Sequence, residues 1–156
     1  MKRLLSSWTL LCVLFQLWAQ IPAGYYEFAT GTHGSGLKTA LFSIITEHTE
    51  RSYKELWMDM QKTDVREDGR VWDMYSSSSD FIFIDDQCGT YKKEEDCYNR
   101  EHSFPKSWFN DDYPMYTDLF HLYPTDGYVT NQRGNYPFGE TNGEKYKSNG
   151  GFSKLG

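Results

Sequence analysis

The chain has 156 residues, of which 17% are aromatic and 38% hydrophobic, and its formal net charge is −6. This length fits one globular domain at most. The aromatic content excludes disorder over the whole chain, because disordered chains are poor in aromatic residues. The acidic balance argues against tight binding of nucleic acid, since affinity for a phosphate backbone rests on Lys and Arg.

The first nineteen residues have the pattern of a secretory signal peptide. Lys2 and Arg3 give a positive start, and the mostly apolar run from Leu4 to Ala19 is too short for a membrane span. We therefore expect a secreted or periplasmic protein without a membrane anchor. Without this segment, 14 Lys and Arg stand against 22 Asp and Glu, a charge of −8, and two of the three cysteines remain.

The two remaining cysteines, Cys88 and Cys97, are an even pair in an oxidising compartment, with a spacing that suits a small loop. This favours a disulfide, which would stabilise the fold by about 3 kcal/mol in the chain-entropy model. A zinc site is the alternative. The spacing argues against it, because no CxxC motif or paired His lies near either cysteine.

Two amphipathic helices are predicted first along the chain. The first has Ser35 as its candidate N-cap and ends with His48 on a packing face. Its apolar positions recur at helical spacing and are Leu37, Ala40, Leu41, Ile44 and Ile45. The second groups four apolar residues on one face, before a turn signal at Asp68 and Gly69; they are Tyr53, Leu56, Trp57 and Met60.

The middle of the chain predicts short strands rather than helices. Strands are expected over residues 71–75 and 81–84, and a short strand over residues 98–102. Residues 104–139 carry four of the five prolines and many aromatic residues, which predicts a long ordered loop system. Long irregular segments inside compact domains are usually functional.

A set of polar residues in this half has the composition of a hydrolytic site. Glu101 and His102 lie together after Asn99 and Arg100. Five further candidates follow within some thirty-five residues, and they are Asp118, His121, Asn131, Arg133 and Asn135. Carboxylate and amide oxygens suit Mg²⁺, His suits proton abstraction from water, and Arg suits phosphate, which together match metal-assisted phosphodiester hydrolysis. Neighbours on a strand face opposite ways, so the strand must end or twist at this pair.

Three motifs with this spacing resemble the bacterial endonuclease I family. They are CYNREHSFPKSWF at residues 97–109, YTDLFHLYPTDGYV at residues 116–129 and RGNYPFGE at residues 133–140. That family consists of secreted or periplasmic nucleases of the ββα-metal, or His-Me finger, superfamily. The resemblance implies an α+β fold with mixed helices and short strands around a ββα-metal motif, in a domain spanning residues 24–156.

The resemblance also implies site roles. Glu101 would be a ligand of a single Mg²⁺, for which Ca²⁺ or Mn²⁺ are candidate substitutes. His102 would be the general base that activates water, with its other ring nitrogen donating to a carbonyl or carboxylate. Arg133 would either contact phosphate or hold the local helix, and both roles remain open.

The sequence departs from the family at the second metal ligand. The family has Asn directly after the Val of its second motif, where this chain has Thr130, and Asn131 follows one step later. In a helix one step rotates the side chain by about 100°. Three readings remain: Thr130 is a weaker hydroxyl ligand, Asn131 moves in through a local register shift, or much of the activity has been lost.

The leading hypothesis is a secreted, Mg²⁺-dependent, sequence-nonspecific endonuclease acting on DNA, with RNA as a further candidate substrate. Arg100, Lys106 and Arg133 would line a local basic cleft, and we expect a monomer. The alternative is a catalytically impaired or dead secreted binding or scaffold protein with the nuclease fold. Family members continue past the third motif, so we also expect a chain truncated at its C-terminus, with reduced stability and solubility.

Overall fold

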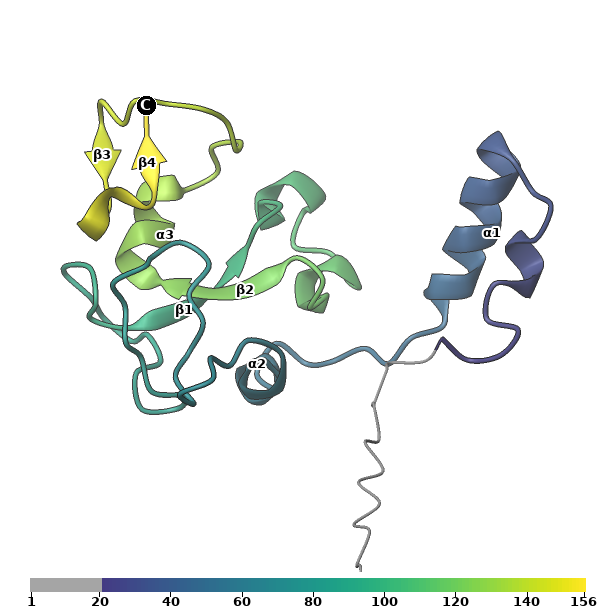
Figure 1. The fold of residues 1–156 in the computed structure, drawn as a ribbon, viewed down its shortest axis with the longest axis horizontal. Helices are drawn as coiled ribbons and strands as arrows, with labels where there is room; N and C mark the ends of the chain where they lie inside the picture. Colours follow the sequence, from purple (N-terminus) through teal and green to yellow (C-terminus); the bar gives the residue numbers. More distant parts are fainter. Residues whose placement is uncertain (1–20) are drawn as a thin grey trace, which may run out of the picture. The chain divides into compact units, whose positions relative to one another are not determined.

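The computed structural model describes residues 21–156, and the predicted signal peptide lies outside them. The chain forms two units, Met1–His48 and Thr49–Gly156 (Figure 1). The described part of the first unit is helical, and the second combines helices with short antiparallel strand pairs. This confirms the predicted α+β class. Over the described residues, no helix has the length and apolarity needed to cross a membrane.

The first unit contains the 3-10 helix η1 (Glu27–Ala29) and the helix α1 (Gly34–Thr46). The residue that precedes α1 as its N-cap is His33, so the prediction of Ser35 as the cap is wrong. The placement of His48 on a packing face is also wrong. The helix ends two residues earlier, and the exposed His48 ring lies with its Nδ1 atom 2.9 Å from the carbonyl oxygen of Thr46.

The second unit is built around a ββα arrangement. Strand β1 (Tyr98–His102) pairs antiparallel with β2 (Leu122–Asp126), and helix α3 (Gly127–Arg133) follows β2 directly (Figure 1). The carboxylate of Asp126 accepts hydrogen bonds from the N–H groups of Tyr128 and Val129 in the first turn of α3, which otherwise have no partner in the helix. The strand β1 was predicted. The prediction of a long ordered loop system over residues 104–139 is wrong at residues 122–133, which form β2 and α3.

The two faces of the β1–β2 pair contact different neighbours. Alternate side chains of a strand point to opposite sides, and α3 covers the side that carries Glu101 and Thr125, through contacts described below. The other side carries the buried Tyr98 and Leu122. Leu122 packs in a core cluster with the buried residues of α2 (Leu56–Thr63), whose apolar face the sequence predicted.

The segments predicted as strands at residues 71–75 and 81–84 are irregular. Val71 forms only an isolated bridge with Val65, and its N–H donates to the carbonyl oxygen of Phe81 at 3.0 Å. The buried carboxylate of Asp73 accepts hydrogen bonds from the N–H groups of Tyr75 and Ser76. A local side-chain acceptor thus replaces the strand partner that these N–H groups would need.

The disulfide between Cys88 and Cys97 is present, as predicted. It packs against the start of α3, where a Cβ atom on Gly127 would collide with the Cys88 sulfur. Only glycine therefore fits at the first position of α3, and the disulfide supports the helix that carries Thr130 and Arg133.

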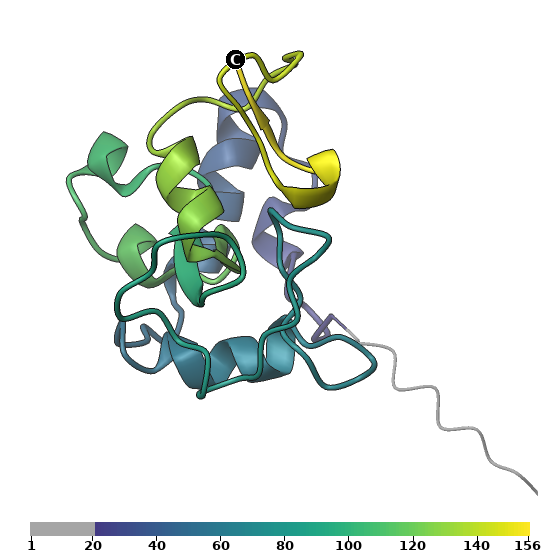
Figure 2. The ribbon, with the colours of Figure 1, turned by 90° about the vertical axis from the view of Figure 1, so that its left-hand side faces the viewer.

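After α3 the chain forms a small β-hairpin that lies beside this helix. Strands β3 (Tyr146–Lys147) and β4 (Lys154–Leu155) pair antiparallel and enclose the 3-10 segment η4 (Asn149–Gly151). Figures 1 and 2 both show this hairpin beside α3. Two further 3-10 turns lie between β1 and β2, at η2 (Lys106–Phe109) and η3 (Met115–Thr117).

Candidate active site

The candidate site lies where β1 ends. Glu101 and His102 are the last two residues of the strand, and both side chains are buried. Glu101 contacts Tyr75 and Arg133, whereas His102 contacts Tyr116, so the two side chains lie on opposite faces of β1. For both groups to reach one phosphate, the strand must end or twist at this pair, and it does end there.

Among the described residues, the Glu101 carboxylate is hydrogen-bonded through only one of its oxygens. Its Oε1 atom accepts hydrogen bonds from the Tyr75 hydroxyl at 3.1 Å and from Arg133 Nη1 at 2.8 Å. Burial raises the pKa of Glu101 to about 7, although the Arg133 charge opposes this shift. Its Oε2 atom accepts no hydrogen bond from the described residues. The second oxygen is therefore available to a ligand.

Arg133 joins the end of α3 to the end of β1. Besides Glu101, Nη1 donates to the carbonyl oxygen of His102 at 3.1 Å, and Nη2 donates to that of Ser103 at 2.7 Å. Its Nε atom donates to the carbonyl oxygen of Tyr136 at 3.1 Å, and the side chain is only 12% exposed. These contacts favour the positioning role of Arg133 over direct contact with phosphate.

The His102 ring is held in one tautomer by a backbone carbonyl. Its Nε2 atom lies 3.0 Å from the carbonyl oxygen of Tyr116 and must donate to it, which leaves the lone pair on Nδ1. The ring stacks on the Tyr116 ring, with centroids 5.5 Å apart. Burial lowers the pKa of His102 below its ordinary value, so the ring is neutral at pH 7. The carbonyl partner that the sequence required is thus Tyr116.

Thr130 and Asn131 occupy different faces of α3. The Thr130 hydroxyl hydrogen-bonds to the hydroxyl of the fully buried Thr125 on β2. Residues three apart share a helix face, so Thr130 lies on the same face as Arg133, toward Glu101. Asn131 is exposed, and its side chain makes no hydrogen bond within the described chain. The helix continues through this position without the register shift that would bring Asn131 to the site.

The donors at this point fit a hard divalent cation held by few protein atoms. No group of three or more His, Cys, Asp or Glu side chains among residues 21–156 has metal-binding geometry. Mg²⁺ does not need such a group, because it retains several waters and is often bound through one or two protein oxygens. Glu101 Oε2 and the Thr130 hydroxyl are candidate ligands, because both residues lie where α3 meets the β1–β2 pair.

Several residues of this site were not found from the sequence. Tyr75 is 26 positions before Glu101, and Tyr116 acts through its backbone, which no side-chain pattern reveals.

His121 lies with its ring centroid 5.7 Å from that of His102, but its Nε2 atom is 2.7 Å from the carbonyl oxygen of Met115. His121 is therefore held by the loop between β1 and β2 that contains it.

The basic residues expected to line a cleft are all engaged with other groups. The Arg100 guanidinium lies 3.7 Å from the Tyr53 ring centroid and 4.0 Å from that of Trp57. Lys106 Nζ lies 2.7 Å from the Asp111 carboxylate. With Arg133 bound to Glu101, none of the three is a free cation for phosphate.

Comparison with known families decides the relationship. The Endonuclease I family model matches residues 33–156. The chain belongs to the Endonuclease I family. An extracellular ribonuclease of Bacillus amyloliquefaciens is 33% identical over 134 residues, and one of Bacillus subtilis (strain 168) is 34% identical over 133 residues. Each match covers 82% of this chain and 44% of the relative, so the chain spans less than half the length of these two ribonucleases. No solved structure gives a significant match. The Endonuclease I family is generally metal-dependent.

Proposed function

We propose that the chain is a secreted, metal-dependent nuclease that hydrolyses phosphodiester bonds of RNA and DNA without sequence specificity. The observation that carries the proposal is the pair at the end of β1. His102 is neutral with a lone pair on Nδ1, and the adjacent Glu101 keeps Oε2 free. RNA is placed first among the substrates because the relatives are named extracellular ribonucleases.

In this proposal His102 removes a proton from water through Nδ1. The water oxygen forms a new bond to phosphorus as the bridging P–O bond breaks. The Tyr116 carbonyl holds the Nε2–H group and stabilises the positive charge that the ring acquires. Arg133 fixes the backbone of His102 and the carboxylate of Glu101 together, which makes it a positioning residue.

Glu101, through Oε2, and Thr130, through its hydroxyl, are the residues proposed to hold one Mg²⁺. Mn²⁺ and Ca²⁺ are the proposed substitutes. When bound, the ion supplies positive charge that stabilises the charge developing on the phosphate. Because the nearby basic residues are already engaged, we expect weak binding of the nucleic acid that depends little on salt concentration.

A second candidate function is a catalytically impaired binding protein. The observation in its favour is Thr130, whose hydroxyl is engaged with Thr125 and carries no amide oxygen for a cation. Such a protein would bind single-stranded or duplex nucleic acid but leave it intact, with or without added metal.

The decisive experiment follows cleavage of an RNA oligonucleotide and of plasmid DNA by the secreted chain in Mg²⁺, in EDTA and after Mg²⁺ is added back. We expect cleavage that EDTA abolishes, that Mg²⁺ restores and that His102→Ala lowers by at least about 100-fold. Binding without cleavage by folded protein would favour the second candidate. Cleavage that survives EDTA, or that His102→Ala does not change, would contradict the proposal.

A further inference from the structure

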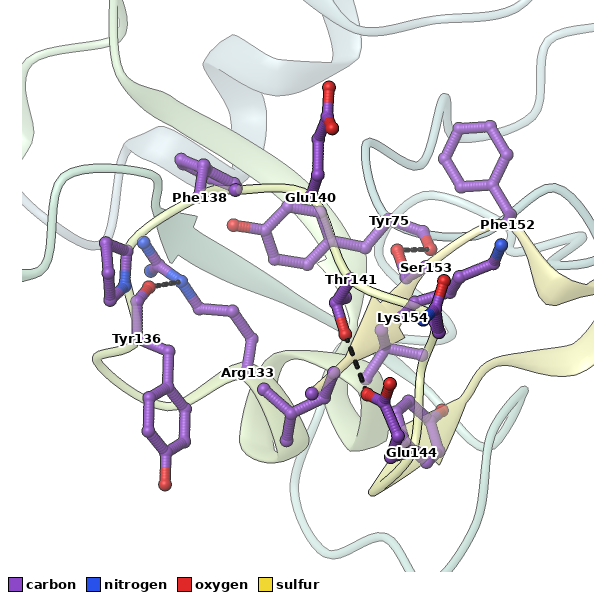
Figure 3. Close-up of a pocket in the computed structure, with 17 residues that line it drawn as sticks. Tyr75, Arg133, Tyr136, Phe138, Glu140, Thr141, Glu144, Phe152, Ser153 and Lys154 are labelled. Atoms are coloured by element: carbon purple, nitrogen blue, oxygen red, sulfur yellow. Dashed lines mark hydrogen bonds between the residues drawn. The ribbon is translucent and has the colours of Figure 1, made fainter.

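The second unit contains a hollow of about 950 Å³ (Figure 3). One side is formed by α3 and the segment that follows it, and the other side by the β3–β4 hairpin. The lining of the hollow includes Tyr75 and Arg133, and both of these side chains donate to Oε1 of Glu101. The hollow therefore shares a wall with the candidate active site. A group bound in it would be separated from the Glu101 carboxylate by a single layer of side chains.

Phe138 gives the hollow an aromatic ring that is held in place but not covered. The guanidinium carbon of Arg133 lies 4.8 Å from the centroid of this ring. The Tyr75 ring meets it at an angle of 66°, with centroids 6.2 Å apart. Phe138 nevertheless remains 61% exposed. Figure 3 shows Phe138 beside Tyr75 and above Arg133. The contacts fix the ring, and its uncovered surface is available for stacking.

Polar side chains also line the hollow, beside apolar ones such as Val129 and Leu155. Thr141 donates to Glu144 at 3.2 Å, and Ser153 on the hairpin side donates to the carbonyl oxygen of Tyr75 at 2.6 Å (Figure 3). Lys154 also lines the hollow and forms no ion pair within the described chain. Glu140 and Glu144 line the hollow as well, so Lys154 offsets only part of their negative charge. The feature that suits a flat heterocycle is therefore the open aromatic surface.

We propose that this hollow binds one unpaired base of the nucleic acid close to the cleaved phosphate, by stacking on Phe138, and that it makes single strands the preferred substrate. This inference rests on the proposed nuclease function and names its substrate class. A base in a duplex is paired and stacked, and it must be flipped out at a cost of a few kcal/mol before it enters a side pocket. An unpaired base does not bear this cost.

The kinetic test compares a single-stranded RNA oligonucleotide with the same strand in a full duplex. Phe138→Ala should raise KM for the single strand about 10-fold, because stacking of one base is lost, with kcat little changed and duplex cleavage unaffected. Phe138→Trp should restore the KM. Phe120→Ala is the matched control, since Phe120 is 92% exposed and is absent from the lining. Equal losses on single strand and duplex, or an effect of Phe120→Ala as large as that of Phe138→Ala, would overturn the proposal.

A binding test separates this inference from the catalytic one. A single-stranded oligonucleotide containing 2-aminopurine is titrated with protein in EDTA, where cleavage is not expected. Stacking on Phe138 should quench the fluorescence, and Phe138→Ala should weaken the apparent affinity about 10-fold. Quenching without any cleavage in Mg²⁺ would support the base site while contradicting the nuclease proposal. Quenching that is unchanged by Phe138→Ala, or no quenching at all, would overturn the base site even if the chain cleaves RNA.

Discussion

Arg133 Nη1 lies 2.8 Å from Oε1 of Glu101 and joins the last residue of α3 to the penultimate residue of β1. This ion pair is nearly buried on both sides, with the side chains 12% and 8% exposed. It occupies one carboxylate oxygen, and the other accepts no hydrogen bond from the described residues. The geometry of the site therefore depends on a contact between segments 32 residues apart in the sequence.

Arg133→Ala should destabilise the fold strongly. It leaves the Glu101 carboxylate buried without its cation, and removal of one partner of a buried ion pair costs about 3–5 kcal/mol. Urea denaturation measures the loss in the free energy of unfolding. Arg51→Ala is the control, because Arg51 pairs with Asp59 at 2.8 Å but is 36% exposed; its loss should be much smaller than that of Arg133→Ala, since solvent screens an exposed pair. Equal losses in the two variants would contradict the structural role of Arg133.

Thr130→Asn should improve the metal site. An amide oxygen is a better cation ligand than a hydroxyl that is engaged with Thr125. The Mg²⁺ concentration that gives half-maximal cleavage should fall by about 10-fold, the scale of effects around metal sites. Asn131→Ala should leave this concentration unchanged, since Asn131 is exposed. A large increase in the Asn131→Ala variant would assign the ligand to Asn131 instead.

Mg²⁺ binding should depend on pH through Glu101. Burial raises the pKa of Glu101 to about 7, and the cation binds only the ionised carboxylate. The apparent affinity should therefore rise as pH increases from 6 to about 7 and level off above pH 8, changing by about 10-fold per unit below the pKa. Calorimetric titration measures it, with Glu101→Gln as the control that lacks this dependence. A constant affinity between pH 6 and pH 8 would contradict the role of Glu101.

The cleavage rate at saturating Mg²⁺ should have its acidic limb below pH 6.5. Burial lowers the pKa of His102 from its ordinary value. The ring therefore keeps its Nδ1 lone pair until the pH falls through that lowered pKa, and the rate should decline only there. A pH–rate profile over pH 4 to 8 checks this. A limb centred above pH 6.5 would mean that the base is not a buried histidine.

Local sequence patterns anticipated some of these features well. The Cys88–Cys97 spacing predicted the disulfide, and helical periodicity predicted the buried face of α2. Alternation of residue types failed at residues 71–75, because the Asp73 carboxylate captures the N–H groups that a strand would use. The pattern could not show that choice, since a strand and a turn both suit such a short segment.

The sequence indicated some residues of the site and missed others. The motif resemblance indicated Glu101, His102 and Arg133, and the chemistry of a general base required an acceptor for the second ring nitrogen. The identity of that acceptor, the Tyr116 carbonyl, depends on how the loop between β1 and β2 folds back on β1. The contact of Tyr75 with Glu101 is likewise set by packing between distant segments.

The most direct test of the account compares two neighbouring histidines. The single-turnover rate of RNA cleavage is measured at saturating Mg²⁺ for His102→Ala and His121→Ala, whose native rings lie 5.7 Å apart. Loss of a general base should lower the rate by about 100- to 10,000-fold in His102→Ala. His121→Ala should retain a rate within about 10-fold of the native chain, less than the loss of a base. Similar losses in both variants, or a larger loss in His121→Ala, would contradict the assignment of His102 as the base.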